Sequence, residues 1–305
     1  MTSASLQHPL DQGDAPARLA RPARRFSWAW LGVAPFFVFA FLFLFLPSLS
    51  LFVGSFQDPQ GNFTLANIAG LFTPSIRSAY WITIRISVFT AVAGGLFGFF
   101  VAYAGVLSGL PRWVRDGLMT FSGVASNFAG VPLAFAFIAT LGRLGMVTVL
   151  LKEVFGINLY AGGFSLYSFW GLSLTYLYFQ FPLMVLIITP ALEGLRRDWR
   201  EAAENLGATG WQYWRYVGLP ILLPSLLGAM ILLFGNAFGA YATALSLTGG
   251  LINLVTILIG AQIKGDVLHN VGLGNALALG MVVIMAISMA GYYALRRRSE
   301  RWMRL

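Results

Sequence analysis

Six long stretches of the chain contain no Asp, Glu, Lys or Arg: residues 26–57, 86–111, 117–142, 154–192, 216–263 and 267–295. A helix rises about 1.5 Å per residue, so about 20 apolar residues cross the hydrocarbon core of a membrane. Strands of a membrane barrel would alternate in polarity over about 10 residues, and Phe36 to Pro47 do not alternate. We therefore predict an all-α integral membrane protein. Its six transmembrane helices are expected at about 28–54, 79–106, 117–143, 164–192, 220–248 and 273–295.

Composition excludes several other classes of protein. The chain is 58% hydrophobic and only 10% charged, whereas soluble domains carry about 25% charged residues. The absence of cysteine excludes disulfides, iron–sulfur clusters, thiolate zinc and a cysteine nucleophile. His8 and His269 are the only histidines, too few to build a histidine metal site alone. We predict no catalytic, cofactor-binding or metal-binding residue.

The basic residues predict which side of the membrane each loop faces. With six helices, 15 of the 20 Lys and Arg residues fall on one side, in the N-terminal tail, the second and fourth loops and the C-terminal tail. The other side has 5: Arg77, Arg85, Arg143, Lys152 and Lys264. The positive-inside rule then places both termini in the cytoplasm. In this setting the net charge of +9 reports orientation in lipid, and no nucleic-acid partner is expected.

The predicted domain organisation follows from these spans. Residues 1–27 form a cytoplasmic N-terminal tail, residues 28–295 the six-helix membrane domain, and residues 296–305 a cytoplasmic C-terminal tail. Arg24-Arg25-Phe26 before an apolar run also resembles an export signal. That run is longer than a signal sequence uses, and no small-residue cleavage site follows it.

The stretch 216–263 is long enough to hide two spans. Gly249-Gly250 interrupts it and leaves only Leu251 to Ile263 before Lys264. Thirteen residues are too few to cross a membrane, so a re-entrant or surface helix is expected there.

One hydrophilic segment, at about 193–219, interrupts the membrane pattern on the predicted cytoplasmic side. Arg200 to Leu206 are mostly good helix formers, and Gly207 suits a left-handed C-cap. Pro220 is tolerated in the first turn of the next helix. The aromatic residues Trp211, Trp214 and Tyr216 fit the headgroup zone of a membrane. The segment therefore predicts a helix–turn–helix on the cytoplasmic face, and an ordinary interfacial helix stays open as the alternative.

This segment resembles the signature (EAA) loop of permease subunits of binding-protein-dependent ABC importers. The family pattern is Glu-Ala-Ala, three residues, Gly, nine residues, Ile, one residue and Leu-Pro. This chain has Glu201-Ala202-Ala203, Gly207, Val217 in place of Ile, and Leu219-Pro220. The resemblance runs from about Trp28 to the end of the chain. It extends more weakly to residues 127–132 and 247–250.

The resemblance implies an ABC importer permease fold and a mechanism of coupling. The loop 199–220 would dock into a cleft on a cytoplasmic ABC ATPase dimer, which drives the spans between inward and outward access. Glu201 would pair with a basic group, Ala202 and Ala203 would pack in the cleft, and Gly207 would make the bend. Further implied partners are a second permease subunit of a different chain, an external solute-binding protein and membrane lipid.

The family also implies a location and a range of solutes. The chain would be a multi-pass subunit of the bacterial inner membrane that forms half of a translocation pathway. It most resembles the spermidine/putrescine-type group, whose relatives also serve iron, phosphonate and other small solutes.

The chain lacks the residues with which it would power transport itself. Its only lysines, Lys152 and Lys264, do not follow a glycine, so no phosphate-binding loop of the Gly-x4-Gly-Lys type occurs. No Asp or Glu falls within a predicted span, where ion-driven carriers usually keep one. A transport subunit powered by a partner is therefore expected. A self-contained carrier or channel, and a membrane-embedded enzyme, stay open as alternatives.

Several polar residues within the spans are candidates to line a solute path. We select Tyr176, Gln180, Asn236 and Tyr241, the last two because their helix follows the coupling loop. Hydrogen bonds between helices explain such residues equally well. Gly94-x3-Gly98 and Gly235-x3-Gly239 predict close helix packing.

Arg77, Trp81 and Arg85 recur every four residues and share one helix face. Arg85 is expected to extend toward the outer surface, or alternatively to meet an anionic cargo or the binding protein.

Overall fold

The computed structural model describes residues 29–265 and 269–302, so the predicted N-terminal tail lies outside the described residues. Contacts divide the chain into two units, residues 1–48 and 49–305, which are described separately. The first unit contains α1 (Ala29–Ala40), a π-helical turn η1 (Phe41–Phe45) and the start of α2 (Leu46–Ser55). Side chains of this segment are nearly all exposed, and only Ala40 is buried between residues 32 and 48.

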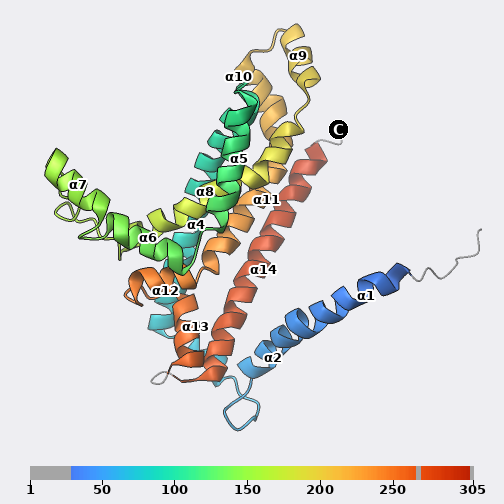
Figure 1. Ribbon diagram of the computed structural model, residues 1–305. Coiled ribbons are helices and arrows are strands. Elements are labelled where there is room, and N and C mark those ends of the chain that lie inside the picture. The colour runs from blue at the N-terminus through green and yellow to red at the C-terminus, as the bar shows by residue number, and fades with distance from the viewer. Residues whose placement is uncertain (1–28, 266–268, 303–305) are drawn as a thin grey trace, which may run out of the picture. The chain divides into compact units, whose positions relative to one another are not determined.

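The second unit is helical almost throughout (Figure 1). After α2 it comprises α3 (Ala66–Gly70), α4 (Pro74–Leu107), α5 (Arg112–Asn127), α6 (Val131–Leu141), α7 (Met146–Phe155), α8 (Phe169–Glu193), α9 (Arg197–Asn205), α10 (Gly210–Tyr213), a second π-helical turn η2 (Trp214–Gly218), α11 (Leu219–Phe238), α12 (Ala242–Thr248), α13 (Val255–Lys264) and α14 (Val271–Trp302). Within the described residues the only β-type pairing is an isolated bridge between Gln57 and Phe63.

Six helical segments are long and apolar enough to cross a membrane, which is the number that the uncharged stretches predict. The third lies later in the chain than the expected 117–143 and includes Arg143, Lys152 and Glu153. They are Gly32–Ser55, Pro74–Leu107, Val131–Phe155, Phe169–Glu193, Gly210–Phe238 and Val271–Arg297. The short helix expected between Leu251 and Ile263 is α13. The all-α membrane fold with six spanning helices is therefore confirmed.

Two predicted helices are wrong as single elements. The helix expected over 117–143 is two helices, α5 and α6, because Gly130 has a φ of 75° and Val131-Pro132 starts a new helix. The helix expected over 220–248 ends at Phe238, and α12 begins at Ala242. Both segments are apolar enough to cross in one piece. Gly130 and Pro132 divide the first, and the second is interrupted over residues 239–241.

The core lies where α4, α8 and α11 pack together. Gly94 and Gly98 make this packing close. A Cβ added at Gly94 would lie 2.7 Å from the Cβ of Gln180, and one at Gly98 would lie 2.5 Å from the carbonyl oxygen of Phe181. The second glycine pair behaves differently. A Cβ added at Gly235 would lie 2.8 Å from Met285 of α14, whereas one at Gly239 would meet only the carbonyl oxygen of Gly235, at 3.5 Å.

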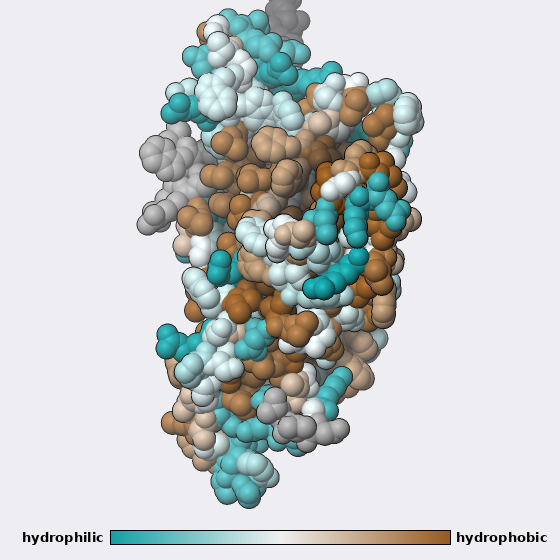
Figure 2. Space-filling view, turned by 90° about the vertical axis from the view of Figure 1, so that its left-hand side faces the viewer, coloured by the Kyte–Doolittle hydropathy of each residue, from teal (hydrophilic) through white to brown (hydrophobic). Residues whose placement is uncertain are grey.

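Polar groups fix α13 and α14 against α4. The hydroxyl of Tyr80 donates to the carbonyl of Leu277 at 2.6 Å, and the amide of Val255 donates to Thr83 Oγ1 at 3.1 Å. In Figure 1, α9 and α10 lie at one end of the second unit, and the start of α14 lies at the other. Figure 2 shows hydrophilic surface at the top and bottom, and between them a largely hydrophobic surface that hydrophilic side chains interrupt at mid-height.

Candidate functional site

The loop expected to couple to an ATPase contains the helix α9, which ends at a glycine with left-handed backbone. Gly207 has a φ of 80°. The amide of Ala208 donates to the carbonyl of Ala203 at 3.0 Å, and the amide of Gly207 donates to Glu204 at 2.9 Å. These bonds satisfy the last carbonyls of α9 in the manner of a Schellman cap. The prediction that Gly207 closes this helix is correct.

Arg200 and Glu204 of α9 pair with each other, whereas Arg197 and Glu201 have no ion pair among the described residues. Arg200 Nε donates to Glu204 Oε1 at 2.8 Å, and this bond raises the pKa of Arg200. Arg196 and Asp198 pair at 2.8 Å. Glu201 is exposed, and no ion pair joins it to another residue in the described part of the chain. Its carboxylate is therefore available to a partner.

A hollow of about 380 Å³ lies between α9 and the end of α4. Glu201 and Arg200 line it on one side, and Tyr103 and Trp214 on the other. Ala202 is exposed and Ala203 half-buried. The small alanine side chains leave the surface of α9 open to close approach.

Large apolar side chains on the same loop face solvent. Leu206 is 88% exposed, Trp211 74% and Tyr216 68%. Sequence reasoning placed the aromatic residues in the headgroup zone and missed Leu206. The sequence does contain a signal for it, because Leu206 is a large apolar residue immediately before the capping Gly207, at the end of a helix rich in charged residues.

The C-terminal side of the loop continues without interruption into the membrane. Thr209 caps α10 through a reciprocal pair of bonds with Gln212. From Gly210, helical backbone runs through η2 into α11. Leu219 and Pro220 begin α11 directly after η2, so Pro220 lies within continuous helical backbone, where it donates no amide hydrogen bond. Trp214 packs edge-on against Tyr103 of α4, with ring centroids 5.2 Å apart. Displacement of α10 therefore displaces α11.

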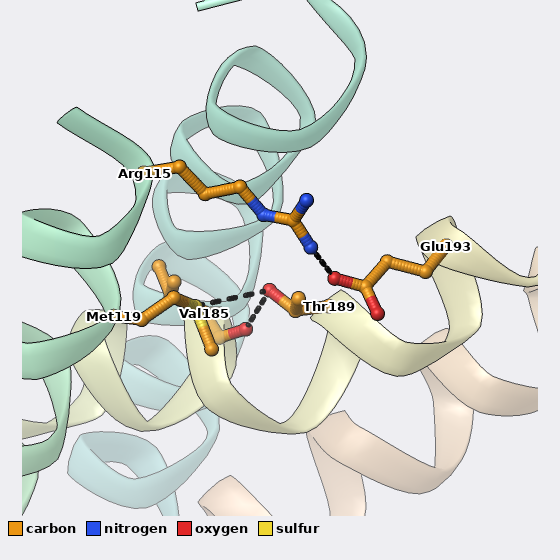
Figure 3. A network of polar contacts seen from close by, with 5 residues as sticks. All are labelled: Arg115, Met119, Val185, Thr189 and Glu193. Atoms are coloured by element: carbon orange, nitrogen blue, oxygen red, sulfur yellow. Dashed lines mark hydrogen bonds and ion pairs between the residues drawn. The ribbon is translucent and has the colours of Figure 1, made fainter. Parts of the chain in front are cut away.

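The N-terminal side of the loop is fixed to α5 (Figure 3). Arg115 of α5 forms an ion pair with Glu193, the last residue of α8. One turn earlier, the hydroxyl of Thr189 donates to the carbonyl of Val185 at 2.7 Å and lies 3.7 Å from the sulfur of Met119. The loop is thus anchored to α5 and α8 before it begins.

Two of the four predicted path residues are buried in the core. Tyr176 donates its hydroxyl to the carbonyl of Ala240 at 2.9 Å, and Gln180 Nε2 donates to the carbonyl of Leu233 at 2.9 Å. Both side chains come from α8 and bond to the end of α11 or to the break that follows. Gln180 Oε1 is buried and has no hydrogen-bond partner among the described residues.

The other two path residues flank the break between α11 and α12. Asn236 is exposed on the last turn of α11. Tyr241 is 37% exposed and lies against α13, where a Cβ added at Gly260 would be 2.8 Å from its hydroxyl. The structure therefore brings all four predicted residues to the region around residues 233–241, two inside the core and two at its surface.

The two helix breaks meet each other. The amide of Gly130 donates to Thr243 Oγ1 at 2.7 Å, and Thr243 is buried. Asn127, at the end of α5, is exposed beside this junction. Asn127 and Thr243 both fall within predicted spans, but the sequence did not predict that the two breaks come together.

No group of three or more potential metal ligands occurs among the described residues.

Known proteins resemble this chain over most of its length. The family described as "Binding-protein-dependent transport system inner membrane component" matches residues 94–304. The probable sulfate transport system permease protein cysT of Chlorella vulgaris is 28% identical over 58% of this chain, and the alignment spans 64% of that protein. The spermidine/putrescine transport system permease protein PotB of Haemophilus influenzae is 26% identical over 88% of this chain and 94% of its own length. The sulfate permease protein CysW of Escherichia coli is 26% identical over 88% of this chain and 87% of its own length.

The fold agrees with these sequence matches. A chain of a bacterial ABC transporter that imports the acidic polysaccharide alginate superimposes with a TM-score of 0.72 at 16% identity, covering 88% of this chain and 95% of that one. The family match alone covers more than half of the chain, from the middle of α4 onward. The chain therefore belongs to the family of inner-membrane components of binding-protein-dependent transport systems, and it is a multi-pass transport subunit, not an enzyme.

Proposed function

We propose that this subunit couples solute import to a separate cytoplasmic ABC ATPase through the loop 199–220. Glu201 pairs with a basic group of the ATPase, while Ala202, Ala203 and Leu206 pack into its cleft. The observation that carries the proposal is the state of α9: an exposed helix with an unpaired carboxylate and an exposed leucine, anchored at both ends to the membrane helices.

The contacts at both ends of the loop allow movement of the loop to be transmitted to the membrane helices. On one side the loop follows directly from α8, which packs along α5 and pairs with it through Glu193 and Arg115, and on the other side α10 continues into α11. Both α5 and α11 end at breaks, and these breaks are joined by the bond from Gly130 to Thr243. A displacement of α9 is therefore transmitted to this junction both through α5 and through α11.

We further propose that this junction lines half of a translocation path, which a second permease subunit completes. Asn127, Asn236 and Tyr241 present uncharged polar groups at the surface there. Such groups let a hydrophilic solute exchange hydrogen bonds without being held as an ion pair. Tyr176 and Gln180 contribute by holding the end of α11 in place from behind.

The solute is a small hydrophilic molecule delivered by an external binding protein. The sequence favours a polyamine-type solute, and PotB supports it. The cysT and CysW relatives make sulfate the second candidate. Uptake of labelled putrescine and labelled sulfate into cells that express the complete system, with and without this subunit, distinguishes the two.

The coupling role is tested in proteoliposomes that contain the subunit, its ATPase, the second permease and the binding protein. Glu201→Lys and Gly207→Asp should reduce transport and transport-linked ATP hydrolysis at least tenfold, while the purified subunit stays monodisperse. Glu153→Lys reverses a charge on α7, remote from the loop in sequence, and should leave both rates unchanged. Normal transport by either loop variant would contradict the proposal.

Crosslinking gives a second, independent test. The chain has no cysteine, so Leu206→Cys introduces a single thiol at the exposed end of α9. It should crosslink to the ATPase, whereas a matched Phe63→Cys in the loop on the opposite side should not. A Leu206→Cys variant that labels only from the periplasm would overturn the assignment.

A further inference from the structure

A groove of about 900 Å³ runs along the surface between α4 and α14, near the end of the unit that is predicted to face outward. Its walls are mainly apolar and include Trp81 and Ile84 of α4 together with Val283 and Ile284 of α14. Arg77 is the one charged residue that lines it. The groove thus combines an apolar trough with a single cation.

The floor of the groove is built from specific contacts. The hydroxyl of Tyr80 donates to the carbonyl of Leu277 at 2.6 Å and lies against Gly280, where an added Cβ would be 2.3 Å from the hydroxyl oxygen. This close contact holds α4 and α14 at a fixed separation. The groove is therefore a defined feature of the α4–α14 pair.

Arg77 differs from the second arginine on the same face of α4. The guanidinium of Arg85 lies over the ring of Phe169, 5.3 Å from its centroid. Arg77 is exposed and has neither an ion-pair partner nor an aromatic ring beneath its guanidinium in the part of the chain that the structure describes. Its charge therefore has no counter-ion among the described residues.

The order of residues along α4 matches the order of zones in a bilayer. Arg77 lies in the first turn of α4, Trp81 one turn deeper and Ile84 two turns deeper. With a rise of about 1.5 Å per residue, Ile84 lies about 10 Å below Arg77 along the helix. Cations and tryptophan are typical of the headgroup level, and aliphatic side chains of the acyl level.

We propose that this groove binds an anionic phospholipid of the outer leaflet. Its phosphate pairs with Arg77, and one acyl chain lies between Trp81 and Ile84 on one side and Val283 and Ile284 on the other. Charge complementarity supports this occupant, because a zwitterionic lipid offers the unpaired guanidinium no net charge. The inference rests on the membrane location of the chain and not on which solute it carries.

The test uses the assembled transporter in nanodiscs that contain phosphatidylglycerol, phosphatidylethanolamine or both, followed by native mass spectrometry. The unmodified complex should retain phosphatidylglycerol at least fivefold more than phosphatidylethanolamine. Arg77→Gln should abolish this preference. Arg85→Gln is the matched control, on the same helix face but outside the groove lining, and it should keep the preference. Equal retention by the Arg77→Gln and unmodified complexes would overturn the proposal.

Two further measurements identify the occupant. Val283→Trp fills the acyl part of the groove, so it should reduce retention of phosphatidylglycerol although Arg77 is intact. Val283→Cys, labelled with a photoactivatable group, should form adducts with lipid. Adducts with another protein chain, or displacement of phosphatidylglycerol by inorganic sulfate or phosphate at millimolar concentration, would show that the groove serves a subunit or an anionic solute instead.

Discussion

The backbone amide of Gly130 donates to the side-chain oxygen of Thr243 across 2.7 Å, and this bond joins the breaks of two membrane helices. The two residues are 113 positions apart in the chain. Neither break could persist in an apolar environment if its free backbone groups had no partner. The bond gives the amide at the α5–α6 break its acceptor, and at the α11–α12 break the hydroxyl of Tyr176 donates to the carbonyl of Ala240.

Replacing Thr243 tests this junction. Thr243→Val keeps the shape of the buried side chain and leaves the amide of Gly130 without an acceptor, which should cost about 1–3 kcal/mol of unfolding free energy. Thr248→Val is the control, because the hydroxyl of Thr248 bonds to Ala244 within its own helix and its loss leaves no amide unpaired. Thermal unfolding in detergent should separate the two variants, and equal losses would show that the junction bond contributes nothing specific.

The close packing of α4 on α8 makes a second prediction. Gly98→Ala places a Cβ 2.5 Å from the carbonyl oxygen of Phe181, so the helices must separate at a cost of about 1–3 kcal/mol. Gly123→Ala, on α5, meets nothing within 4 Å and should be neutral or stabilising by about 0.5–1 kcal/mol. Melting temperatures of the two variants, measured under the same conditions, test this prediction. A Gly98→Ala variant as stable as Gly123→Ala would exclude the close approach.

The left-handed backbone at Gly207 can be tested apart from side-chain contacts. A Cβ at Gly207 meets nothing within 4 Å, so Gly207→Ala suffers only from its φ of 80°, at about 1–2 kcal/mol. The end of α9 should fray, which hydrogen exchange at the amides of 206–208 detects, and stimulated ATP hydrolysis should fall. Gly210→Ala, also in open space but without positive φ, should leave both readings unchanged.

The pair of Arg115 and Glu193 should contribute little to stability. Both side chains are about two-fifths exposed, at 40% and 43%, and such pairs are worth about 0–1 kcal/mol in water. A double-mutant cycle with Arg115→Gln and Glu193→Gln should give a coupling energy in that range that shrinks at high salt. A larger coupling with no salt dependence would mean that the pair is shielded from water in the assembled transporter.

The number of spanning helices was predictable from the sequence, because six stretches without charged residues are each long enough for one span. The break after Phe128 could also have been predicted, because Gly130-Val131-Pro132 places glycine before a helix start and proline inside its first turn. Hydropathy alone does not show this break, because the whole stretch is apolar enough to cross a membrane in one piece. Gly239 was interpreted as a packing glycine, whereas it follows the last residue of α11.

The candidate site was only partly predictable. The cap at Gly207 follows from local backbone preference, which is why its prediction is correct. The surroundings of Tyr176 and Gln180 depend on which face of α8 meets α11. Since α8 is apolar nearly all round, its sequence does not indicate that face. The roles of these two residues and of Asn236 and Tyr241 stay predictions.

The glycine face of α4 bears on how the protein is made. The apolar window of Phe169–Glu193 is 61% buried, and Gly94 and Gly98 of α4 pack directly against this helix. Because α8 follows α4 in the chain, the glycine face of α4 lies uncovered in the bilayer until α8 has been synthesised.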